Sequence, residues 1–253
     1  MNTKLLWTSG WDSTFRLVQL SRMEGDVTPV YVKGDNRHSE SIEIEHMNTL
    51  LDLLKKHPET KANLLPLEII DKKDIPLDEE ITESYYNLRK IAAVGTQYEW
   101  LARYAKLNPG IELGAIMPDG EYSGIRYIIN TYGSYDTTET GSYVLSKSCT
   151  YKDCINVFGN FAFPLAFTTE NEMKKIVEEL GYEEIMSHIW FCHHPIKGET
   201  CGLCRPCEQK IEGHMEYLVT ADAMKRYRFQ KKLCKVFGKK IGKKIAHVIY
   251  RGL

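Results

Sequence analysis

The alternation of short apolar segments with helical patterns over the first 117 residues constrains the fold more than any other feature. Four segments read as short buried strands, and three segments with apolar residues at helical spacing stand between them. A strand, a helix and a second parallel strand form a right-handed crossover, so repeated alternation builds a parallel sheet. We therefore expect an α/β fold, a Rossmann-like parallel sheet with helices on both faces. The expected strands are residues 4–8, 27–33, 64–70 and 111–117, and the expected helices are residues 13–23, 39–56 and 85–107.

The junction after the first strand, in the stretch LLWTSGWDSTFRLVQL (residues 5–20), is rich in small polar residues. An ordinary helix cap would explain Asp12 or Ser13, because either side-chain oxygen can accept hydrogen bonds from free amides of the first turn. It would not explain the run of three small residues, TSG, that precedes them. A turn of small residues at the carboxyl end of a parallel strand leaves backbone N–H groups open to an anion. The pattern therefore predicts a phosphate-binding turn, with a plain capped turn as the alternative.

The alternation stops beyond residue 117. Residues 118–154 hold many Tyr, Gly, Ser and Thr without a helical period, and we expect them to form a binding loop, a lid or a small β excursion. Residues 170–181 then indicate a helix that Gly181 closes, and residues 208–219 indicate a further helix.

Four cysteines lie close together in the stretch WFCHHPIKGETCGLCRPCEQK, with the spacing C-x8-C-x2-C-x2-C. Two-residue gaps let neighbouring thiolates converge on one ion, and four thiolates complete the tetrahedral shell of a structural zinc ion. An iron–sulfur cluster and four unrelated buried thiols are the alternatives. The expected metal ligands are Cys192, Cys201, Cys204 and Cys207.

Positive charge is concentrated in the final segment of the sequence. Residues 225–251 carry eleven Lys or Arg and no Asp or Glu, although the whole chain has a net charge of −1. Apolar residues recur there at three- and four-residue steps, which indicates a basic amphipathic helix. Such a helix docks on the acidic remainder of the chain, or it meets RNA or a partner protein; a membrane partner is not expected. The expected domains are residues 1–222, including a zinc element at 190–210, and a helical basic tail at 223–253.

The composition is that of an ordinary globular protein, with 43% hydrophobic and 26% charged residues. No stretch approaches the roughly 18 apolar residues of a membrane helix. The first strand begins close to Met1, so no signal peptide is expected. Seven cysteines without a secretory signal indicate a reducing compartment, and we therefore expect a cytoplasmic protein.

Two of these signals together resemble a known family. Read without gaps, TSGWDS (residues 8–13) resembles the S-G-G-x-D-S signature of PP-loop ATP pyrophosphatases, with Thr for Ser and Ser for the first Gly. The spacing of the four cysteines resembles that of the 7-cyano-7-deazaguanine synthase (QueC-like) family within that group. KGDNRHSESIE (residues 33–43) and YKDC (residues 151–154) are similar to two further segments of the family. The likeness spans nearly the whole chain up to the cysteines.

The resemblance implies a PP-loop fold (adenine nucleotide alpha hydrolase-like) and a C–N-forming ligase of queuosine biosynthesis that uses ATP, Mg²⁺ and Zn²⁺. Such enzymes adenylate the carboxylate of 7-carboxy-7-deazaguanine, release pyrophosphate and couple the activated acid to ammonia, giving an amide and then a nitrile. The catalytic residues that it implies are Asp12, Ser13 and Asp153, with Asp12 positioning Mg²⁺ and Asp153 facing the guanine-like edge of the substrate. The ATP-binding residues that it implies are Thr8, Ser9, Gly10, Trp11, Asp12, Ser13, Thr14, His38 and Asp119.

The chain departs from the family pattern at Thr96-Gln97 and Lys152, where the family commonly shows Arg-Asn and Pro. It also has a long insertion before residue 151 and a basic tail beyond the family core. These changes fall where the family binds the deazapurine and the acceptor amine. The resemblance therefore does not identify the acceptor. A second reading is therefore a divergent member of an antiviral-defence system, which joins the deazaguanine to an amine of a partner protein. A third reading is a non-catalytic zinc module whose basic tail binds nucleic acid. A homodimer is compatible with each.

Overall fold

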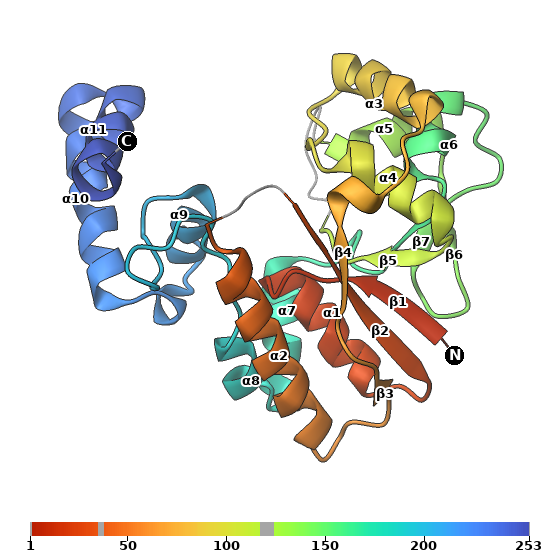
Figure 1. Ribbon diagram of the computed structural model, residues 1–253, viewed down its shortest axis with the longest axis horizontal. Helices are drawn as coiled ribbons and strands as arrows, with labels where there is room; N and C mark the ends of the chain where they lie inside the picture. The colour runs from red at the N-terminus through yellow and green to blue at the C-terminus, as the bar shows by residue number, and fades with distance from the viewer. Residues whose placement is uncertain (1, 35–37, 117–123, 253) are drawn as a thin grey trace. The chain divides into compact units, whose positions relative to one another are not determined.

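The computed structural model describes residues 2–34, 38–116 and 124–252 (Figure 1). The chain divides into two compact units, and each is discontinuous in sequence. Unit 1 comprises Met1–Asp35 and Met47–Ile189, and unit 2 comprises Asn36–His46 and Trp190–Leu253. The predicted boundary after residue 222 falls inside a helix of unit 2, so the cysteine segment and the basic tail belong to the same unit.

Unit 1 contains a mostly parallel sheet in the order β3-β2-β1-β5-β8-β7-β6, with β4 also paired to β2. β1, β2, β3, β4, β5 and β8 form the parallel part, and β7 and β6 extend it in antiparallel fashion. The expected α/β fold with a parallel central sheet is therefore confirmed. The strands are β1 (Asn2–Leu6), β2 (Asp26–Lys33), β3 (Asn63–Leu64), β4 (Glu68–Asp71), β5 (Ile111–Leu113), β6 (Tyr135–Thr137), β7 (Tyr143–Leu145) and β8 (Phe161–Phe163).

Helices flank this sheet in two groups (Figure 1). α1 (Trp11–Ser21) packs with α7 (Glu170–Leu180) and α8 (Glu183–Ser187). The second group packs on the other face and shares one hydrophobic core with residues of β5 and β8. It consists of α3 (Glu79–Ile91), α4 (Tyr98–Leu107), α5 (Gly124–Tyr132) and α6 (Lys152–Phe158).

The predicted helix at residues 85–107 is wrong as a single element. α3 ends at Ile91, α4 begins at Tyr98, and the backbone of Ala92 is extended with φ −147° and ψ 163°. The apolar spacing continued across the break because both helices bury residues in the same core. The predicted helix at 170–181 is confirmed: Thr169 and Glu172 form a capping box before α7, and Gly181 closes the helix with φ 73°.

The described part of residues 118–154 contains the β6–β7 hairpin, which matches the predicted β excursion, and the helix α5, which the sequence analysis did not predict. β7 pairs with β8 through Tyr143 and Phe163, so the hairpin adds two antiparallel strands to the edge of the central sheet. Asp119, one of the expected ATP-binding residues, lies outside the described residues.

The remaining helices belong wholly or partly to unit 2. α2 (Glu40–Lys56) begins there, and α9 (Arg205–Glu212) begins directly after Cys204 and contains Cys207. The predicted helix at 208–219 is therefore displaced, since α9 ends at Glu212 and a short 3₁₀ turn follows at Glu216–Leu218.

The basic tail is two helices rather than one. α10 (Ala221–Phe237) and α11 (Lys239–Arg251) pack side by side and are joined at Gly238, whose φ is 80°. A Cβ on Gly242 would lie 2.4 Å from the backbone nitrogen of Cys234, so only glycine lets the two helices approach this closely. We call α10 and α11 the helical hairpin.

Candidate functional site

The turn between β1 and α1 contains one residue with an uncommon backbone conformation. The strand ends at Leu6, the helix begins at Trp11, and Ser9 between them has a φ of +49°. This is the left-handed region, which non-glycine residues rarely adopt. The Ser9 side chain is fully buried, so the turn is an ordered part of the core edge.

The hydrogen bonds around the turn fix both of its ends. The Trp7 amide donates to the Val30 carbonyl at 2.8 Å, which holds the end of β1 against β2. The Trp7 indole N–H donates to Thr14 Oγ1 at 3.0 Å and ties the strand to the first turn of α1. The first helical hydrogen bond of α1 runs from Thr14 N to Gly10 O at 2.9 Å.

The start of α1 does not use the cap that its sequence suggested. The N-cap is Gly10, which has no side chain to cap the helix. The Ser13 hydroxyl accepts a hydrogen bond from the Thr8 amide and donates one to the Gly10 carbonyl, both at 3.4 Å. Asp12 and Ser13 are instead the second and third residues of the helix. Asp12 and Ser13 therefore do not occupy the N-cap position, and the capped turn stays an alternative to the phosphate-binding turn. The first amides of a helix point outward along its axis and carry its positive dipole end, which favours an anion.

The turn lies where the strand order of the sheet reverses. The chain passes from β1 to β2 on one side and, after β4, returns to β5 on the other side of β1. Ligands of open α/β sheets bind at the carboxyl ends of the strands at this switch point. The exit of β5 comes so close that a Cβ on Gly114 would lie 2.8 Å from the Ser13 Cα.

A buried ion pair at Arg16, one helical turn after Asp12, supports the start of α1. Arg16 donates from Nε and Nη2 to the two carboxylate oxygens of Glu112 on β5, both at 2.7 Å. The Ser142 hydroxyl donates to the same carboxylate at 2.9 Å, and both charged side chains are buried. Sequence reasoning missed this network, although a charged residue within each of two apolar segments was a signal for it.

The other expected site residues are distributed more widely. Thr8 is exposed, Gly10 and Asp12 are half-buried, and the remaining turn residues are buried. Asp153 lies in the first turn of α6, where its carboxylate accepts a hydrogen bond from the Tyr151 hydroxyl at 3.2 Å. His38 belongs to unit 2, where its ring centroid lies 6.1 Å from that of His194.

The second site is the cysteine cluster of unit 2, in which all four sulfur atoms lie within 4.8 Å of one another. Cys201 Sγ is 3.9 Å from Cys207 Sγ, and Cys204 Sγ is 4.0 Å from Cys192 Sγ. Zn–S bonds of about 2.3 Å in a tetrahedron place the sulfurs about 3.8 Å apart. The four buried cysteines can therefore hold a metal ion.

Backbone amides and a guanidinium stabilise negative charge on the Cys201 sulfur. The amides of Leu203 and Cys204 donate to it at 3.3 and 3.2 Å, and Arg251 donates from Nη2 at 3.0 Å. Thiol hydrogen bonds from Cys192, Cys204 and Cys207 hold the pKa of Cys201 below its ordinary value, and the Leu203 amide lowers it further. Such donors are the expected surroundings of a metal-bound thiolate.

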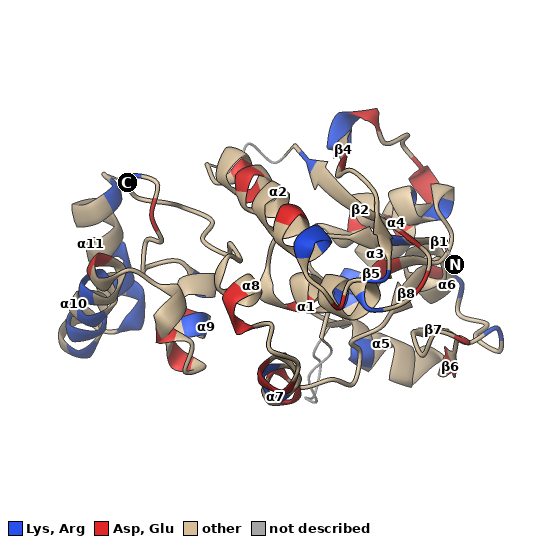
Figure 2. Cartoon of the chain, turned by 90° about the horizontal axis from the view of Figure 1, so that it is seen from below, with Lys and Arg blue, Asp and Glu red and all other residues tan. Residues whose placement is uncertain are grey.

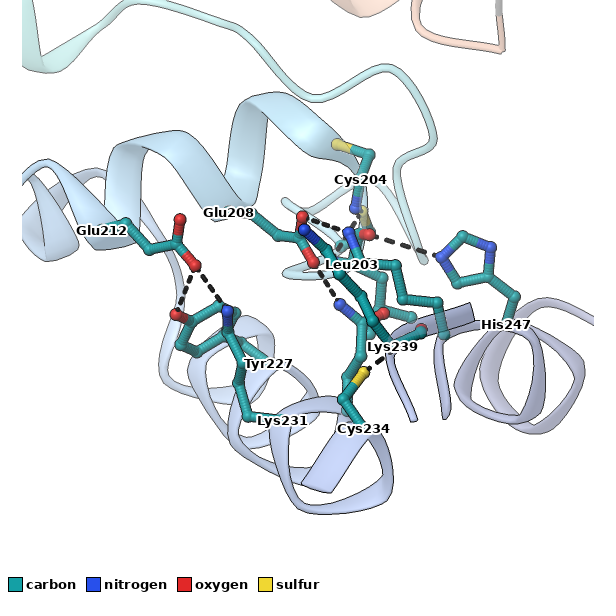
Figure 3. A network of polar contacts seen from close by, with 12 residues as sticks. Leu203, Cys204, Glu208, Glu212, Tyr227, Lys231, Cys234, Lys239 and His247 are labelled. Carbon is teal, nitrogen blue, oxygen red and sulfur yellow. Dashed lines mark hydrogen bonds and ion pairs between the residues drawn. The ribbon is translucent and has the colours of Figure 1, made fainter. Parts of the chain in front are cut away.

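The helical hairpin forms a polar shell around this cluster. Arg226 on α10 donates to the carbonyls of Cys201 and Thr200 at 2.9 and 2.8 Å. The His247 ring on α11 lies within hydrogen-bond distance of the Leu203 carbonyl (Figure 3). The apolar side chains of Trp190 and Leu203 pack around the sulfurs. The basic tail and the cysteine segment thus form one folded body.

No protein-family model matches the chain, and no curated protein matches it. Within the described residues, no helix combines the length and the apolar character that crossing a bilayer requires.

Proposed function

We propose that this protein is an ATP-dependent adenylating enzyme of the PP-loop kind, which activates a carboxylate and couples it to an amine. The observation that carries the proposal is the β1–α1 turn. It joins a helix start with glycine at the N-cap to a buried left-handed serine at the switch point of a parallel sheet. Oriented amides at such a position stabilise a departing pyrophosphate.

The proposed chemistry explains why the site needs a polyphosphate. A carboxylate is a poor acyl electrophile because its leaving group would be oxide. In the proposed reaction a carboxylate oxygen attacks the α-phosphorus of ATP, the bond to the β-phosphate breaks, and pyrophosphate leaves. An amine then attacks the acyl carbon and AMP departs with the former carboxylate oxygen. The turn amides and the Ser13 hydroxyl bind the leaving pyrophosphate, and Asp12 would hold Mg²⁺ there.

The proposed substrate is 7-carboxy-7-deazaguanine, which rests on the family resemblance. Asp153 supports it chemically, because a carboxylate can accept the paired N–H donors of a guanine-like edge. The Tyr151 hydroxyl donates to Oδ2 of Asp153 and fixes the side chain, leaving further acceptor positions on the carboxylate.

The proposed metal is zinc, held by the four cysteines in a structural role. Four thiolates complete a tetrahedral shell and leave no open position for substrate. Zinc would organise the segment from Cys192 to Cys207, whose core consists of the cysteines and a few apolar neighbours.

The purified protein with ATP, Mg²⁺ and 7-carboxy-7-deazaguanine tests the proposal. We expect AMP and pyrophosphate to form only when the acid is present, and ammonia to give an amide or nitrile by mass spectrometry. Asp12→Ala should abolish the release of AMP, whereas Asp52→Ala, a charge removal on an exposed position of α2, should leave it unchanged. Absence of AMP formation by the wild type, or normal turnover by Asp12→Ala, would show the assignment to be wrong.

A further inference from the structure

Four basic residues form a continuous stripe along α10. Lys225, Arg228, Lys232 and Lys235 follow one another at steps of three, four and three residues, and all four side chains are exposed. This spacing places one cation on each turn of one helix face, about 5 Å apart along the axis. The opposite face of α10 is buried through Ala223 and Gln230, so the helix presents the stripe outward. We call these four residues the α10 stripe.

Most of the stripe has no internal counter-charge. Lys225 pairs with Asp222 at 2.8 Å. Within residues 2–34, 38–116 and 124–252, no carboxylate forms an ion pair with Arg228, Lys232 or Lys235.

Two neighbouring lysines on the inner side of the hairpin are neutralised. Lys231 pairs with Glu212 at 2.6 Å, and Lys243 pairs with Glu208 at 2.5 Å (Figure 3 shows the first pair). The hairpin thus sorts its cations into an inner set that α9 neutralises and an outer set that it does not.

The outer set continues into the start of α11, where Lys239, Lys240 and Lys244 are also exposed. Figure 2 shows Lys and Arg gathered along α10, with acidic residues distributed mostly over other elements. Like charges this close repel one another in the free protein, and a bound polyanion would relieve that repulsion.

We propose that the α10 stripe binds the phosphate backbone of a nucleic acid. A row of cations with one member per helical turn suits a ligand whose anionic groups repeat along a line. Neutralising several phosphates at once also releases counterions, which drives binding. Contacts to phosphates carry no sequence information, so binding through this row of cations is expected to be independent of sequence.

The placement of apolar residues favours nucleic acid over an anionic lipid surface. A membrane-surface helix carries its apolar face and its cations on the same helix. On α10 only Val236 and Phe237, next to the turn, are large exposed apolar side chains. The other exposed apolar residues of the hairpin, among them Ile241, Val248 and Ile249, lie on α11 beside its exposed lysines. A lipid surface would therefore contact α11 and not the α10 stripe.

Fluorescence anisotropy of the full-length protein with a labelled 20-base-pair DNA duplex and a 20-nucleotide RNA tests this. Four phosphate contacts give a slope of log K against log salt of about −3.6 on the duplex, a loss of about 100-fold between 50 and 200 mM salt. The variant Arg228→Gln/Lys232→Gln/Lys235→Gln should reduce the slope by about 2.7 and weaken binding at 50 mM salt more than about tenfold. Circular dichroism and metal content check that this variant remains folded.

The matched control removes three positive charges from unit 1. Lys55→Gln/Lys56→Gln/Lys61→Gln changes three exposed lysines of unit 1 and should leave the slope unchanged. No binding of the wild type to either probe at 100 μM protein and 50 mM salt would overturn the proposal. Equal effects of the two triple variants would overturn it as well. So would binding to vesicles of 70% phosphatidylcholine and 30% phosphatidylserine that Ile241→Ser/Val248→Ser abolishes, in the absence of binding to nucleic acid.

Discussion

The guanidinium of Arg251 lies against the sulfur of Cys201, with Nη2 3.0 Å from Sγ, although the two residues are 50 positions apart in sequence. Four thiolates around one divalent zinc ion carry a net charge of −2, so a cation in contact with one of them offsets part of that charge. The last turn of α11 is therefore attached to the proposed metal centre by charge as well as by packing.

Replacing Arg251 with Gln should weaken metal retention without removing a ligand. Loss of a group that donates to a ligand typically costs about 10- to 100-fold in metal affinity. We expect zinc release to a chelating dye to be faster by about that factor. Arg228→Gln, which removes an exposed cation of α10, is the control. Equal release rates for both variants and the wild type would show that Arg251 does not act on the metal.

Removing a cysteine of the cluster should have a larger effect. Cys204→Ser replaces one sulfur of the four, and binding of a structural metal is coupled to folding of its segment. We expect this variant to be insoluble or to lack metal by elemental analysis, while the wild type contains one zinc per chain. Cys234→Ser, which alters a thiol outside the cluster, should retain the metal. Wild-type protein without zinc or iron would contradict the assignment.

The buried pair of Arg16 and Glu112 should be costly to break. Glu112→Ala leaves the guanidinium buried without its carboxylate, and such losses typically cost about 3–5 kcal/mol of unfolding free energy. Ser142→Ala removes only one neutral donor to the same carboxylate and should cost about 1 kcal/mol. Urea unfolding followed by tryptophan fluorescence measures both. A loss below 1 kcal/mol for Glu112→Ala would contradict the predicted role of the pair.

The start of α3 should give a pH-dependent contribution to stability. A hydrogen bond from Lys106 and one from the Ile81 amide lower the pKa of Asp78. Because the folded state holds the carboxylate ionised more strongly than the unfolded state does, its stabilisation is complete above the ordinary pKa of about 3.9. It is lost as the pH falls through the lower folded-state pKa.

Asp78→Ala should therefore cost about 1 kcal/mol near neutral pH through loss of the helix cap, and less below pH 4. The difference in unfolding free energy between this variant and the wild type, measured from pH 7 to pH 3, tests this. A difference that stays constant over the whole range would exclude an ionised cap.

The features that were predictable from the sequence are local ones. The alternation of strands and helices predicted β1, β2, α1 and the parallel sheet, because each signal lies within about ten residues. The spacing of the four cysteines likewise predicted a cluster whose sulfurs lie within 4.8 Å of one another.

The features that the sequence analysis missed were missed for two physical reasons. Apolar spacing continues through a break when both helices pack on one core, and this hid the ends of α3 and of α10. The second cause is separation in sequence: Arg16 and Glu112 are 96 positions apart, and nothing periodic links them. Only the folded chain brings Arg16 on the apolar face of α1 next to Glu112 on β5.

The local character of the cysteine cluster also sets the order in which the chain can acquire its parts during synthesis. All four ligands emerge from the ribosome together, directly after unit 1 has been translated. Metal can therefore be captured while the helical hairpin is still being made. Arg251 and His247 lie later in the chain, so the side chains that contact Cys201 and Leu203 are made after the four cysteines.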